Sequence, residues 1–145
     1  MRHKLINPGP EKTWAVIFDS GEEVMSRLQR FCEEEKLSAA RFTAIGAFSA
    51  ATLGYFDWNR KEYDEIPVSE QVEVLSLVGD VSLYQNAPKI HAHVVVGKRD
   101  GSACGGHLLE AYVRPTLEII ITESPGYLRR CVDEESGLPL IKLNA

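Results

Sequence analysis

Cysteine is scarce in this chain, and long apolar runs are missing. The three cysteines, Cys32, Cys104 and Cys131, are widely spaced and form no C-x-x-C pair. Their odd number and spacing indicate reduced thiols rather than a disulfide framework. No apolar run approaches the ~20 residues of a membrane-spanning helix, and the opening MRHKLINPGPEKTW lacks the apolar core of a secretory signal peptide. These absences predict a cytoplasmic protein.

Positive charge is also in short supply. The chain has 16 basic and 21 acidic residues, which gives a formal net charge of −5. A protein that binds nucleic acid through its phosphates needs a basic surface, and an anionic membrane surface attracts basic segments. The charge balance therefore disfavours both DNA and membranes as partners.

Repeats, low-complexity segments and internal linkers are absent as well. The 145 residues, 44% hydrophobic and 26% charged, have the size and composition of one globular domain. A chain of this length can bury a core without disulfide bonds. We predict a single domain over residues 1–145.

The coarse pattern is a strand, a helix and then a series of strands. Apolar residues recur at helical spacing between Val24 and Phe31, with Asp19 or Ser20 as N-cap, and this predicts one amphipathic helix at about 21–36. Such an order indicates an α+β domain with a mostly antiparallel, strongly curved sheet, either a half-barrel or a sandwich. The other expected segments are a loop at 6–12, strands at 13–19, 40–57 (two strands around a break at 46–51), 61–68 (an edge strand or arm), 70–86 (with a bulge or bend at Gly79), 89–98, 102–113 and 116–124, and a tail with a short helix or turn and then an extended piece.

Three of the four histidines lie in IHAHVVVGKRDGSACGGHLLEAY. His91 and His93 are two residues apart, so they share one face if residues 89–98 form a strand. Asp100-Gly101 is a hairpin signal, and a turn there places His93 opposite His107, with Cβ atoms ~5 Å apart. A bulge at Gly105-Gly106 would change this parity.

Two interpretations of this triplet remain open on the residues alone. Three imidazoles on one face are the ligand set of a zinc ion with an open fourth position, and they also suit copper, iron or nickel. Alternatively, the H-x-H pair is an ordinary polar part of a sheet surface. Asp80, Glu73 and Glu110 are candidate carboxylate partners, although strand parity turns Glu110 away from His107.

No residue receives a catalytic role from the sequence. Cys104 has no evident base beside it, so we interpret it as a buried, inert thiol. Neither a nucleophile elbow nor a phosphate-binding loop is present.

Four segments resemble, in order, the motifs of the plant and prokaryote conserved domain, or PPC domain, a family that also carries a DNA-binding label. They are AIGAFSAATLGYFD, VEVLSLVGDVS, HAHVVVGKRDGSACGGHLLEA and TLEIIIT. The resemblance implies a core at about 13–124 followed by a tail at 125–145, an α+β fold, and assembly as a homotrimer. It also implies a metal site, with zinc as the expected ion, at His91, His93 and His107 near a subunit boundary.

Plant members of this family bind DNA through a separate AT-hook. This chain has no R-G-R-P segment, and it reads EQVEVL at residues 70–75 where plant members carry Gly-Arg-Phe-Glu-Ile-Leu. The main hypothesis is therefore a zinc-binding homotrimer of the prokaryotic cytosol that acts on or senses a small molecule. The alternatives are a non-catalytic DNA-associated or protein-interaction module, and a metal that only clips the hairpin or the trimer together.

Overall fold

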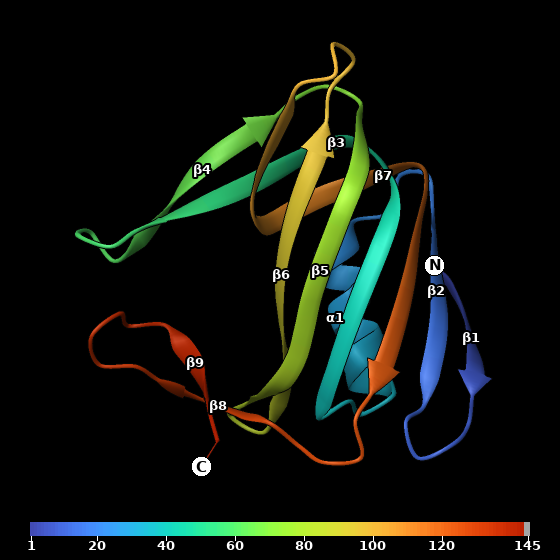
Figure 1. Cartoon of the computed structure of the whole chain (residues 1–145), viewed down its shortest axis with the longest axis vertical. Coiled ribbons are helices and arrows are strands. Elements are labelled where there is room, and N and C mark those ends of the chain that lie inside the picture. Colours follow the sequence, from blue (N-terminus) through green and yellow to red (C-terminus); the bar gives the residue numbers. More distant parts are fainter. Residues whose placement is uncertain (144–145) are drawn as a thin grey trace.

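Strands dominate the fold. They make up 65% of the chain, while helix accounts for 8%. The predicted α+β class is therefore wrong, because a single short helix covers a β-rich fold in the computed structural model, which describes residues 1–143 (Figure 1). The elements are β1 (Arg2–Asn7), β2 (Thr13–Asp19), α1 (Val24–Glu34), β3 (Ala39–Asp57), β4 (Glu62–Val68), β5 (Val72–Tyr84), β6 (Ala87–Gly97), β7 (Ala103–Glu123), β8 (Arg129–Val132) and β9 (Pro139–Lys142).

Four strands form a closed circuit. β3 pairs with β5, β5 with β6, β6 with β7, and β7 again with β3, all antiparallel. The sheet thus curls back on itself, further than a half-barrel. β2 and β1 extend it beyond β7, and β8 joins β5 through a short parallel pairing at Leu83↔Arg129.

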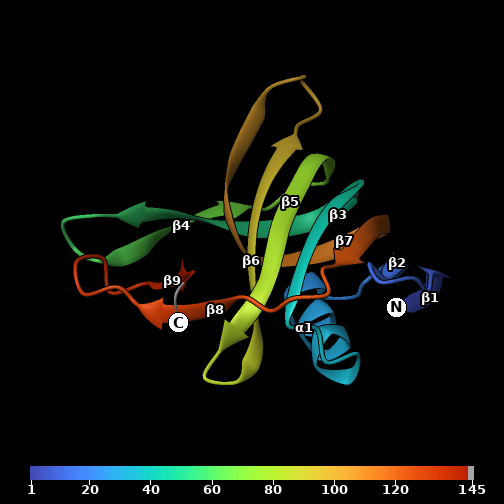
Figure 2. The same ribbon diagram turned by 60° about the horizontal axis from the view of Figure 1, so that its bottom comes forward.

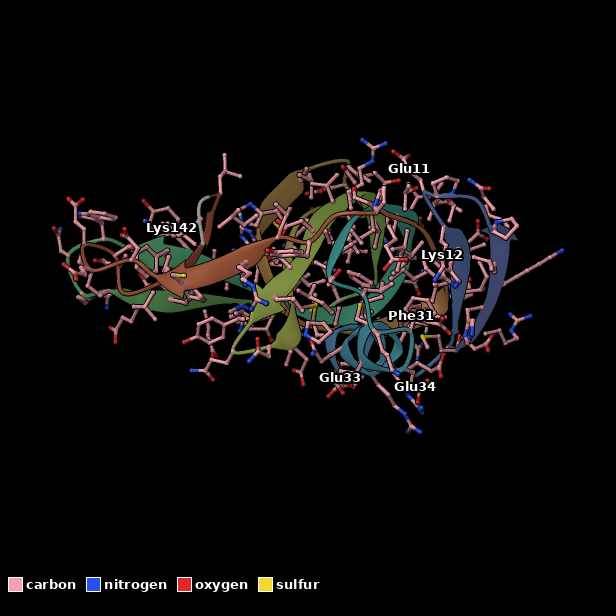
Figure 3. The ribbon with its side chains drawn as sticks, turned by 90° about the horizontal axis from the view of Figure 1, so that it is seen from below. Glu11, Lys12, Phe31, Glu33, Glu34 and Lys142 are labelled. Carbon is pink, nitrogen blue, oxygen red and sulfur yellow. The ribbon has the colours of Figure 1, made fainter. Side chains whose placement is uncertain are left out.

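The core fills the inner face of this circuit. Along β3, Phe42 and Ala44 are buried whereas Thr43 and Ile45 are exposed, as expected for a strand with one solvent face. Helix α1 closes one side of the core. Figure 3 shows Phe31 on the side of α1 toward the sheet, with Glu33 and Glu34 on its outer side.

The helix is shorter than predicted. It begins at Val24 and ends at Glu34, within the expected 21–36. Its N-cap is Glu23, not Asp19 or Ser20, because the Glu23 carboxylate accepts hydrogen bonds from the backbone N–H groups of Met25 (2.9 Å) and Ser26 (2.6 Å). A side-chain oxygen at this place satisfies donors that have no partner inside the helix.

Two predicted breaks are instead bends within long strands. Residues 40–57 belong to one strand, β3, and residues 103–123 to another, β7, interrupted only by shifts in register. Such irregularities bend a strand without ending it, so small residues and a proline were misleading signals. In β5 the register shift lies between Val74 and Ser76, whereas Gly79 pairs regularly, since its missing Cβ makes room for the Phe42 ring.

The chain ends also differ from expectation. Strand β1 includes Ile6 and Asn7 of the loop predicted at 6–12 and pairs with β2, whereas residues 8–12 form a loop as predicted. The tail contains no helix among its described residues and forms the β8–β9 hairpin. The β3–β4 arm and this hairpin both extend from the same side of the body (Figures 1 and 2). The predicted edge strand at 61–68 is confirmed as β4.

Candidate metal centre

Alternation along β6 places His91 and His93 on the outer face of the circuit. Their neighbours Ile90, Ala92 and Val94 are buried in the core, so the residues between them must point outward. His91 and His93 therefore share one face of the strand, as their spacing in the sequence predicted.

The hairpin register brings the third histidine to the same place. His93 pairs with His107, and the pairing continues without a bulge through Gly105 and Gly106. A Cβ on Gly105 would stand 2.8 Å from the Val94 carbonyl oxygen, and one on Gly106 would stand 2.7 Å from that of Gly54. The two glycines therefore let β7 lie close to both neighbouring strands.

The three imidazoles form one cluster. Nε2 of His91 lies 3.1 Å from Nε2 of His93, and one ring nitrogen from each histidine lies within 4.8 Å of the others. A tetrahedral zinc with Zn–N bonds of about 2.1 Å needs its ligand nitrogens about 3.4 Å apart. The cluster is therefore close to the size that such an ion requires.

Burial favours the neutral form of two of the rings, those of His93 and His107. Loss of solvent, followed by the charges of His91, His93 and Lys89, lowers the pKa of His107 from 6.5 to about 4. Burial and the charge of His91 also lower the pKa of His93. Neutral imidazole is the form that binds metals, so protons compete weakly at these two residues near neutral pH.

One atom of the cluster is left without a partner. His107 Nδ1 is buried and makes no hydrogen bond with any described residue. A buried polar atom of this kind is costly unless something outside the chain satisfies it. An orphaned nitrogen in a ring of the cluster, together with the all-imidazole donor set, fits a bound transition metal.

Asp80 stands beside His91. Its Oδ2 lies 3.7 Å from His91 Nδ1, while its Oδ1 accepts a hydrogen bond of 2.6 Å from Nη2 of Arg130. Burial alone would raise the pKa of Asp80, but its contacts with His91 and Arg130 outweigh burial and lower it. The ionised carboxylate faces Nδ1 and leaves Nε2 of His91 toward the cluster, which is the usual arrangement behind a metal-binding histidine.

Hydrogen bonds fix the position of the Arg130 guanidinium. Its Nε donates to Ser82 Oγ (2.6 Å) and its Nη1 to the Pro139 carbonyl (2.9 Å), in addition to the bond with Asp80. These contacts tie the β8–β9 hairpin to the carboxylate that faces His91. Sequence patterns did not single out Arg130, because a basic residue in a tail carries no sign of its partners.

Tyr63 of β4 covers the other side of the cluster. Its ring lies 4.8 Å from that of His107, centroid to centroid, and burial raises the pKa of its hydroxyl. No sequence pattern pointed to Tyr63 either; its position in an edge strand was the only available signal.

The remaining candidates lie elsewhere. Glu73 pairs with Gly97, away from the histidines, and Glu110 accepts a hydrogen bond from the Tyr112 hydroxyl (2.9 Å). Neither belongs to the described group of potential metal ligands. Cys104 is a half-buried free thiol rather than a fully buried one. Of the three carboxylates considered, only Asp80 approaches the cluster.

Comparison with known proteins identifies the family. Residues 6–125 match the Plants and Prokaryotes Conserved (PCC) domain, so the chain belongs to this family, which confirms the resemblance found in the sequence. The chain is also 29% identical over 109 residues to the bifunctional protein GlmU of a Synechococcus species, a match that spans 74% of this chain but only 16% of that protein.

Solved structures share the whole fold. A metal-containing protein from Archaeoglobus fulgidus is 34% identical with a TM-score of 0.83, covering 97% of this chain and 96% of that one. A plant- and prokaryote-conserved protein from Pyrococcus horikoshii is 32% identical with a TM-score of 0.85, covering 97% and 94%. A "putative DNA binding protein" from Bacteroides thetaiotaomicron is 26% identical with a TM-score of 0.89, covering 99% of both.

Helix α1 is too short and too polar to cross a bilayer, and the structure describes no other helix in residues 1–143. The cytoplasmic location and the single-domain assignment stay predictions.

The depressed pKa of His107 predicts a pH-dependent stability of the metal-free protein. The unfolded chain takes up a proton near pH 6.5 and the folded chain only near pH 4, so the free energy of unfolding should fall as the pH drops through this interval. The slope should stay below the limit of about 1.4 kcal/mol per pH unit for one proton, since the ring is partly exposed.

The measurement is urea unfolding in the presence of a chelator, at several pH values, for the native chain and for His107→Gln. The variant should show a shallower loss of stability between pH 6.5 and 4. His3→Gln, at an exposed position outside the cluster, is the matched control and should retain the native slope. Equal slopes in the native chain and His107→Gln would contradict the assignment.

Proposed function

We propose that the protein binds one transition metal ion per chain, with zinc as the expected ion, at His91, His93 and His107, and that it presents this ion to a small molecule. The observation that carries the proposal is the cluster itself: three imidazole nitrogens within 4.8 Å and a buried His107 nitrogen that no described residue satisfies. The name of the Archaeoglobus relative, a metal-containing protein, supports it.

Three protein ligands leave a fourth position of a tetrahedral ion open. A metal bound in this way polarises a carbonyl group or lowers the pKa of a bound water to about 7. The chain's own contribution is to keep two of the rings neutral, to orient His91 through Asp80, and to cover His107 with Tyr63. No general acid or base is assigned.

A homotrimer is the second part of the proposal. A row of exposed apolar side chains runs along the outer face of the circuit, next to His93, and we call it the outer apolar patch: Ile45, Leu75, Val78, Val95 and Ile120, each between 43% and 62% exposed. Val78 pairs directly with His93, so the patch and the histidines share one face. Contiguous exposed apolar surface usually marks an interaction site, and the family resemblance supplies the expected number of subunits.

DNA association is the alternative function, and the names of relatives favour it. The Bacteroides relative and a further one from Ralstonia eutropha, 30% identical with a TM-score of 0.84, are both named as "putative" DNA-binding proteins. These names state a function directly, whereas a histidine cluster indicates only what could bind. The net charge of −5 argues against a strong phosphate-binding surface.

The metal site predicts a defined loss on mutation. Protein purified without an affinity tag and loaded with zinc should retain about one ion per chain, and His93→Ala should lose it, because two ligands remain. Asp80→Asn should keep the ion but bind it about 10–100-fold more weakly, as measured by competition with a chromophoric chelator.

His3→Ala serves as the matched control and should leave the metal content unchanged. An unchanged metal content in His93→Ala would refute the site. If chelation also dissociated or melted the oligomer, the metal would have a structural role.

The outer apolar patch predicts that one charge disrupts assembly. Val78→Asp should convert the oligomer to a smaller species in analytical ultracentrifugation, since a carboxylate buried at an interface is costly without a partner. Val132→Asp, at a similarly exposed valine on β8, should leave the assembly intact. A monomeric native chain, or a Val78→Asp variant of native size, would contradict the interface.

The alternative predicts salt-dependent binding to duplex DNA. Each phosphate contact steepens the fall of log Kobs with log[salt] by about 0.9, so a protein making several contacts should bind at low salt and release DNA as salt increases. Fluorescence anisotropy of a labelled duplex measures this slope. The absence of binding at low salt would exclude DNA association, whatever the metal content.

A further inference from the structure

The cavity beside the histidines lies in a fork between two strands. β6 and β7 pair only from His93↔His107 to Gly97↔Ala103. Beyond His107, β7 continues along β3, starting with Leu108↔Leu53, whereas β6 continues along β5 alone. The strands therefore separate at the candidate metal centre.

The fork contains a cavity of about 270 Å³, near the lower end of the range for small-molecule sites. His91 and His107 line it from the two strands, and Tyr63 lines it from the β4 arm. The chain entering β9, Leu138–Leu140, closes it from the other side. On the scale of about 30 Å³ for one water molecule, it accepts a ligand of roughly nine non-hydrogen atoms.

The wall of this cavity is largely apolar, and its charged side chains are cationic. Ile90, Leu108 and Leu140 contribute aliphatic surface, and none of the lining residues is acidic. Two cationic side chains, Lys89 and Arg130, also line it. A ligand there meets both aliphatic surface and positive charge.

The two cations are not equivalent. Arg130 is already bonded to Asp80, Ser82 and the Pro139 carbonyl. The Lys89 ammonium, in contrast, has no carboxylate within 4.0 Å among residues 1–143 and is exposed to solvent. Lys89 and His91 are two residues apart on β6, so strand alternation turns their side chains to the same face, and both line the cavity. Lys89 is thus the cation of this site that is free to pair with a ligand.

One edge of β6 is open along the same stretch. From Ala87 to Ala92, no described strand pairs with β6 on the side away from β5. At one point on this edge, the Pro88 carbonyl already accepts a hydrogen bond from Gln29 Nε2 (2.8 Å). Elsewhere, an open edge offers backbone donors and acceptors to a ligand in the fork.

We propose that this cavity binds a small aliphatic carboxylate, with its anionic end between the metal at the three histidines and the Lys89 ammonium and its apolar body against the leucines of the fork. The assignment rests on the proposed metal site and adds the class of ligand. Each part of the molecule meets a matching surface: oxygen meets the metal, negative charge meets Lys89, and the hydrocarbon chain meets Leu108 and Leu140.

The test uses cobalt(II) in place of zinc, because its visible spectrum reports metal uptake and a change of ligand separately. Isovalerate is the probe, and isovaleramide is its uncharged counterpart of the same shape. Acetate, which lacks the apolar body, and inorganic phosphate, which is an anion of another class, complete the series. All titrations use the full chain in its native oligomeric state.

Isovalerate should change the spectrum of the cobalt-loaded protein at lower concentration than acetate, phosphate or isovaleramide. Lys89→Met keeps the aliphatic stem and should weaken isovalerate binding about fivefold, as expected for an exposed charge pair, without altering cobalt uptake. Lys4→Met, on β1 outside the cavity, is the matched control and should bind isovalerate as the native chain does.

The outcomes separate the two proposals. Failure of cobalt to bind would refute the metal site. Cobalt binding with no response to isovalerate, or equal binding of isovalerate and isovaleramide by the native chain, would overturn the carboxylate assignment alone. The same holds if Lys89→Met bound isovalerate as tightly as the native chain, or if phosphate bound more tightly than isovalerate.

Discussion

The register between β6 and β7 is the constraint on which the site depends. A slip of one residue in this hairpin would send His93 and His107 to opposite faces, because side chains alternate along a strand. The loop fixes the register: Lys98 N donates to the Ser102 carbonyl (2.8 Å), and Asp100 Oδ1 accepts from Ser102 N (2.9 Å), while Gly101 has a φ of 83°. The histidine cluster thus depends on a turn at the far end of its hairpin, through a series of regular backbone pairs.

The same strand creates the cavity. β7 pairs with β6 along one edge over its first residues and with β3 along the other edge over most of its length, and His107 pairs with both strands. After His107, β7 separates from β6. The point of departure lies at His107, where Gly105 and Gly106 have just let the backbones approach closely. Because β6 and β7 pair closely before His107 and separate after it, the histidine cluster lies where the cavity begins. This is the combination that a site needs to hold an ion and admit a ligand.

The sequence allowed the cluster to be predicted but not its surroundings. His91, His93 and His107 are related by strand alternation and one turn signal, both of which are local. Asp80 could be named only as a candidate, since its link to His91 depends on the pairing of β5 with β6. Tyr63 and Arg130 reach the site from β4 and β8, and no periodicity indicates where an arm or a tail will fold. The predicted fold class was wrong for a related reason. The apolar period of helix α1 is clear in the sequence, so the helix was counted as a major part of the fold, but it has only eleven residues.

Charge at the site is opposite to that of the chain as a whole. The protein carries a formal charge of −5, yet the fork combines Lys89, Arg130 and the His107 ring, which burial keeps neutral. Lys89 has no acidic neighbour within ion-pair distance among the described residues, and Asp80, the nearest carboxylate to the histidines, is bonded to Arg130. A divalent ion held by neutral ligands would keep its full charge there and add to that of Lys89. Salt limits the reach of this charge to about 8 Å at physiological ionic strength. A small anion fits within that distance and would be attracted by the local positive charge. A long polyanion would extend beyond it and would also meet the acidic surface around the site.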